Sequence, residues 1–136
     1  MATNSTVIGD ALRELGVISE VQTPSAEQGL HGLRKLNEMI ETWRETAGVN
    51  IGYFAQTSTT ADCPIPKWCE KGVKAGLAIE LAPTYGASVS AELAKKYEDG
   101  YGAILRRVTV DKLTGADMSH MAPGTGYGRV IDITNG

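Results

Sequence analysis

The chain is short of aromatic residues, of cysteines and of positive charge. Phenylalanine, tryptophan and tyrosine make up only 6% of its 136 residues, so its core must be largely aliphatic. Two cysteines in a chain of this length predict reduced thiols in a cytosolic setting. The formal net charge is −3. This charge argues against a protein that grips nucleic acid by neutralising phosphates, because that mode of binding needs surplus lysine and arginine.

Long apolar runs and a secretory start are also missing. No apolar run approaches the roughly 20 residues that span a bilayer, so we expect no membrane contact. The opening Met-Ala-Thr-Asn-Ser-Thr has neither the basic start nor the apolar stretch of a secretory signal.

The chain also lacks the patterns of a metal or catalytic site. Cys63 and Cys69 have only His31 and His120 as further soft ligands, far from the closely spaced set of four that zinc needs. We therefore expect no metal and no cofactor, with Cys69 buried and Cys63 an exposed loop thiol. Nucleophilic catalysis needs a histidine held beside the nucleophile, which two isolated histidines do not supply. We expect no enzyme.

The strongest pattern present is an amphipathic helix between Pro24 and Gly48. Ser25 and Gln28 have the spacing of a capping box, and Gly48 can adopt the left-handed conformation that ends a helix. Apolar residues recur between them at steps of three and four. We expect the rest of the chain to pack against this helix.

Three further helices are expected, over residues 6–16, 66–83 and about 88–107, with a short extended segment or hairpin between residues 49 and 64. The fold class predicted is all-α: a small bundle of about four helices with a short extended segment or hairpin and an extended C-terminal arm. The expected core residues are Leu12, Leu15, Leu30, Leu33, Leu36, Ile40, Trp43, Leu77, Leu81, Leu93 and Tyr97.

A basic stripe is expected on the third helix. Lys67, Lys71 and Lys74 follow one another at helical spacing, which favours contact with an acidic neighbouring subunit or with passing DNA. A solvated face is the stronger interpretation, because Glu70 dilutes the charge and exposed lysines are common on helices.

The last 28 residues, 109–136, differ from the rest because five of them are glycine. Such a segment buries too little surface to offset its ordering entropy. We therefore divide the chain into a helical domain, residues 1–108, and an extended arm, residues 109–136, that a partner chain holds. Protease protection of the arm in the isolated monomer would contradict this interpretation.

Four segments carry a resemblance to a known family. They are Gly9-Asp-Ala-Leu-Arg-Glu-Leu-Gly-Val17, Leu33-x-x-Leu-Asn-Glu-Met-Ile-Glu-Thr-Trp43, Ile51-Gly-Tyr-Phe54 and Gly76-Leu-Ala-Ile-Glu-Leu-Ala-Pro-Thr-Tyr-Gly86. In this order and spacing the chain resembles the head-to-tail adaptors of short-tailed bacteriophages, also called packaged-DNA stabilisation or head-completion proteins.

The resemblance implies a structural virion protein, assembled in the host cytoplasm and located at the head-to-tail junction. Copies of such a protein form a ring, expected to be a dodecamer, beneath the portal protein. The ring extends the channel for double-stranded DNA, helps retain the packaged genome and docks the tail hub or nozzle. By position alone, the resemblance assigns portal binding to the arm, with Met118, Met121, Tyr127, Arg129, Val130, Ile131 and Ile133 as the contact residues.

Two other functions stay open. One is a cell-wall glycosidase of the same virion, since carboxylate pairs are available among 16 acidic residues in almost any chain of this kind. The other is a helical module that binds another protein. Co-assembly with portal rings would separate the adaptor from both.

Overall fold

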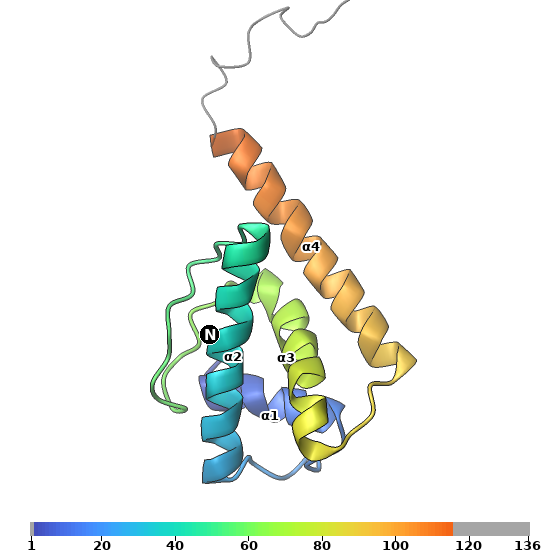
Figure 1. The fold of residues 1–136 in the computed structure, drawn as a ribbon. Helices are drawn as coiled ribbons and strands as arrows, with labels where there is room; N and C mark the ends of the chain where they lie inside the picture. The colour runs from blue at the N-terminus through green and yellow to red at the C-terminus, as the bar shows by residue number, and fades with distance from the viewer. Residues whose placement is uncertain (1, 116–136) are drawn as a thin grey trace, which may run out of the picture. The chain divides into compact units, whose positions relative to one another are not determined.

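The computed structural model describes residues 2–115, with side chains through residue 110. The described residues form four α-helices and one short 3₁₀ helix (Figure 1). They are α1 (Asn4–Glu14), α2 (Ala26–Ala47), η1 (Lys67–Cys69), α3 (Glu70–Tyr85) and α4 (Ala91–Gly115). The predicted all-α class is confirmed. The chain divides into two units between Arg106 and Arg107, and the bundle below belongs to the first.

The connector between α2 and η1 contains no hairpin. Within the described residues, its only β-type pairing is an isolated antiparallel bridge between Thr3 and Asp62. Of the two predicted alternatives, the hairpin is therefore wrong, and residues 49–66 form a connector without a named strand. In place of a partner strand, side chains of α1 and α2 hold the connector, as described below.

The ends of α1 and α2 follow from local hydrogen bonds. Ser25 and Gln28 form the predicted capping box, and Gly48 ends α2 with a φ of 66°, so both predictions are confirmed. Helix α1 begins earlier than the predicted residue 6, because the hydroxyl of Thr3 accepts a hydrogen bond from the Thr6 N–H at 3.1 Å. A hydroxyl at this position satisfies a backbone donor that has no partner within the helix.

Helix α3 does not end at Pro83, as the sequence suggested. It continues to Tyr85, and Gly86 closes it with a φ of 64°. A proline in the last turn removes one backbone hydrogen bond, close to the end of the helix where several carbonyl groups already have no partner within it. The helix can therefore continue past Pro83.

Helix α4 begins where the hydroxyl of Ser90 accepts a hydrogen bond from the Leu93 N–H at 3.1 Å. The helix runs to Gly115, beyond the predicted end near residue 107. The predicted arm therefore starts as helix over residues 109–115 and not as extended chain. The remainder of the arm, with all its expected portal contacts, lies outside the described residues.

Helix α3 is the centre of the bundle. It packs against α1 and α2, and α1 lies across the lower part of both (Figure 1). Glycines of α3 permit close contacts with its neighbours. A Cβ added to Gly72 would lie 2.8 Å from the carbonyl carbon of Gly100 on α4. A Cβ added to Gly76 would lie 3.0 Å from the Met39 sulfur and 3.1 Å from the Trp43 ring. Small residues on α3 thus let α2 and α4 approach its backbone.

Most of the expected core is buried, with Leu30 as the clear exception. Leu30 is 60% exposed, so its assignment to the core was wrong. The buried line at the start of α2 passes through Gly29, Gly32 and Leu33, and a Cβ on Gly32 would lie 2.6 Å from Ile8. Leu30 lies about one quarter of a turn from Gly29 and faces outward. The buried members are Leu12, Leu33, Leu36, Ile40, Trp43, Leu77, Leu81 and Leu93.

Leu15 and Tyr97 are only half-buried. Leu15 is the residue that follows the last turn of α1, so its side chain lies at the edge of the packed surface. Tyr97 stacks on Tyr101 with ring centroids 5.4 Å apart. The ring centroids of Tyr101 and Trp43 lie 4.8 Å apart. These rings join α4 to the end of α2.

Candidate functional site

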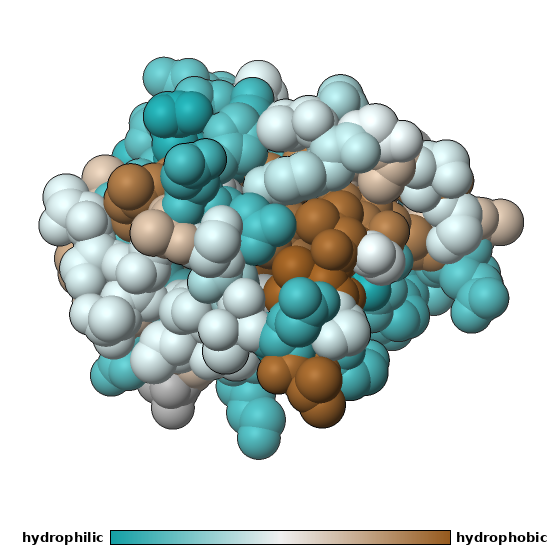
Figure 2. Space-filling model, turned by 90° about the horizontal axis from the view of Figure 1, so that it is seen from below, coloured by the Kyte–Doolittle hydropathy of each residue, from teal (hydrophilic) through white to brown (hydrophobic). Residues whose placement is uncertain are grey.

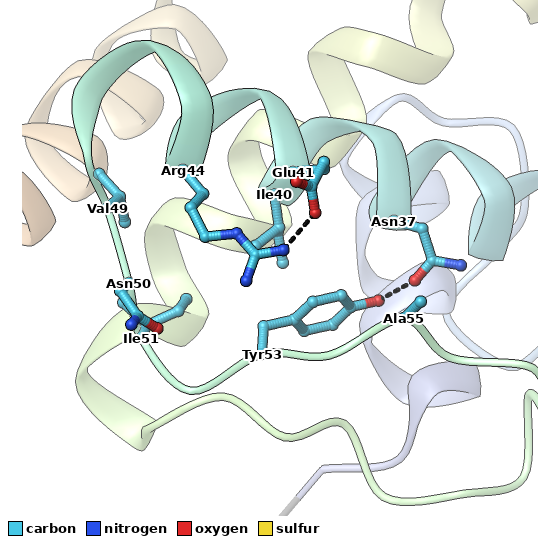
Figure 3. A pocket seen from close by; sticks show the side chains of 9 residues that line it. All are labelled: Asn37, Ile40, Glu41, Arg44, Val49, Asn50, Ile51, Tyr53 and Ala55. Atoms are coloured by element: carbon cyan, nitrogen blue, oxygen red, sulfur yellow. Dashed lines mark hydrogen bonds and ion pairs between the residues drawn. The ribbon is translucent and has the colours of Figure 1, made fainter.

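The connector over residues 49–66 runs along α2 (Figure 1) and is held there by Asn37. The Asn37 amide donates to the Gln56 carbonyl at 3.0 Å, and its oxygen accepts from the Gln56 N–H at 2.9 Å. The Tyr53 hydroxyl also donates to the Asn37 oxygen (Figure 3). Burial, with a smaller contribution from Cys63, raises the pKa of Tyr53, so this hydroxyl stays protonated and remains a donor.

A second polar contact holds the same connector to α1. The buried Asn4 amide donates to the side-chain oxygen of Gln56 at 3.0 Å and to the Ser58 carbonyl at 2.8 Å. Gln56 itself is buried and donates to the Phe54 carbonyl at 2.8 Å. Buried amides paired in this way fix one conformation of the connector.

The small cavity beneath the connector is too small to bind an organic ligand. It has a volume of about 30 Å³ and lies between α2 and residues 49–55 (Figure 3). Arg44 and Glu41 form an ion pair on its α2 side. A space of this size holds about one water, whereas cavities for small molecules are roughly ten times larger. The Asn37 region is therefore a structural anchor for the connector.

Cys63 is fully buried, so its assignment as an exposed loop thiol was wrong. Its backbone N–H donates to the Ala2 carbonyl at 2.8 Å, which draws the end of the connector against the start of the chain. Burial, with the nearby charge of Glu70, raises the pKa of Cys63 to about 11. The thiol is neutral at physiological pH. Cys69 is fully buried, as predicted.

The three lysines of the predicted stripe do not form one exposed face. Lys67 and Lys71 are exposed, and no ion pair joins either of them to another described side chain. Lys74 is half-buried, and its ammonium lies 2.8 Å from Asp10 and 3.4 Å from Glu70. It fastens α3 to α1.

The ion pairs keep Lys74 and a lysine of α4 charged. Burial alone lowers the pKa of Lys74, but its hydrogen bond to Asp10 and the charges of Asp10 and Glu70 leave that pKa raised. The hydrogen bond from Lys96 to Glu14, at 2.7 Å, raises the pKa of Lys96. Both ammonium groups are therefore protonated at neutral pH.

The fold brings two of the predicted lysines together with Lys96 around one groove. The groove has a volume of about 290 Å³, and its walls are Glu14, Lys71, Lys74, Ala75 and Lys96. These residues come from α1, α3 and α4, so no local pattern in the sequence joins them. The sequence spacing of three and four residues found Lys71 and Lys74; only the crossing of α3 and α4 adds Lys96.

Apolar side chains are also exposed on several elements. Val21 is 91% exposed, Phe54 66% and Leu30 60%. Figure 2 shows apolar surface gathered near the centre of the face seen from below, with polar groups around it.

The described residues contain neither a cluster of metal ligands nor a helix that could span a membrane. No three histidine, cysteine or acidic side chains among them are grouped so as to hold a metal ion, and no described helix combines the length and apolar character of a membrane span. Comparison with known proteins adds no relative: no protein-family model matches the chain, and no curated protein matches it.

Proposed function

We propose that this chain is a head-to-tail adaptor of a short-tailed bacteriophage, a structural virion protein whose copies form a ring beneath the portal protein. In this role it extends the DNA channel, helps retain the packaged genome and offers a platform to the tail hub or nozzle. The arm, which includes Tyr127 and Ile131, binds the portal. The chain performs no chemistry of its own.

The observation that carries the proposal is that the segments bearing the resemblance meet in one packed unit. Gly76, which opens the last of these segments, lies against Met39 and Trp43 of the second. Leu12, of the first segment, is fully buried in the same unit. The four segments therefore belong to one folded unit, and the resemblance extends over that unit.

The surface of the bundle is compatible with ring assembly. A closed ring needs two different faces on each copy, because each interface joins unlike surfaces. Exposed Leu30 at the start of α2 and exposed Phe54 in the connector lie on different elements and offer apolar contacts. The net charge of −3 suits a channel through which DNA slides, since a strongly basic wall would hold the phosphates.

Co-assembly tests the proposal. The full chain is mixed with purified portal rings of the same virion, and the product is weighed by native mass spectrometry. The expected result is the addition of many copies, about one for each portal subunit, to a single ring. Failure of the folded chain to join portal rings at any ratio would reject the adaptor function.

A deletion separates the arm from the bundle. Removal of residues 117–136 is expected to abolish or strongly weaken portal attachment, while the helical circular-dichroism signal stays close to that of the full chain. The reason is that every contact of the bundle described above lies within residues 2–106. Loss of the helical signal on deletion would contradict the division into a bundle and an arm.

A further inference from the structure

We draw no further inference here: the strongest candidate, the exposed apolar patch at Phe54 on the connector between α2 and η1, carries none because nothing in the structure shows what covers it.

Discussion

Two glycines of α4, two residues apart, should respond in opposite ways to the same substitution. Gly100 lies against α3: an added Cβ would be 2.6 Å from the Cα of Gly72 and 2.7 Å from its nitrogen. At Gly102 an added Cβ would meet only the end of the Arg106 side chain, at 3.4 Å. Both residues are helical, so the gain in helix propensity is the same at each.

The sizes of the two effects follow from these contacts. Alanine in place of glycine stabilises a helix interior by about 1 kcal/mol, and Gly102→Ala should gain most of this because a flexible side chain can move aside. Gly100→Ala places a methyl group against backbone, which cannot rotate away, so α3 and α4 must separate. Overpacking of this kind costs about 1–3 kcal/mol, and the upper part of that range leaves a net loss of about 2 kcal/mol after the propensity gain.

Thermal and urea unfolding of both variants measure the difference. We expect Gly102→Ala to raise the melting temperature by a few degrees and Gly100→Ala to lower it by roughly twice as much, since 1 kcal/mol corresponds to about 4 °C in a chain of this size. Gly72→Ala should resemble Gly100→Ala, because its Cβ would meet Gly100 at 2.8 Å. A Gly100→Ala variant as stable as Gly102→Ala would refute the close crossing of α3 and α4.

Two further predictions concern the connector. Asn37→Ala removes hydrogen bonds with Tyr53 and Gln56 and should lower the free energy of unfolding by about 2–3 kcal/mol. Asn37→Asp keeps the accepting oxygens and should lower the free energy of unfolding by less, as measured by urea unfolding. Equal losses of stability in the two variants would contradict these hydrogen bonds. The buried Cys63 thiol should make stability fall as pH rises from about 9 to about 11, because burial raises its pKa from the ordinary value of 9.0 to about 11 and the unfolded state therefore loses its proton first. Stability curves of Cys63→Ser should show a shallower alkaline decline, and an unchanged slope would mean that the thiol does not contribute.

The helices and several of their ends could be predicted from the sequence because they depend on neighbours along the chain. The capping box of Ser25 and Gln28 needs residues three apart, and the turn at Gly48 needs only a residue that tolerates positive φ. The stripe through Leu33, Leu36 and Ile40 is a local periodicity. Errors arose where Thr3 supplied the cap in place of Thr6, three residues later, and where a proline was tolerated in a last turn, as at Pro83.

By itself, the sequence determined the all-α class, the presence of four helices in the described part and most of the buried apolar positions, because periodicity and capping are written in short stretches of chain. Only the tertiary structure placed α3 at the centre and turned Leu30 outward. It also buried Cys63 and brought Lys96 beside Lys71. The crossing of α3 and α4 depends on how closely two helix backbones approach, which Gly72 and Gly100 permit from positions that are distant in sequence. The burial of Cys63 depends on the connector meeting the start of the chain.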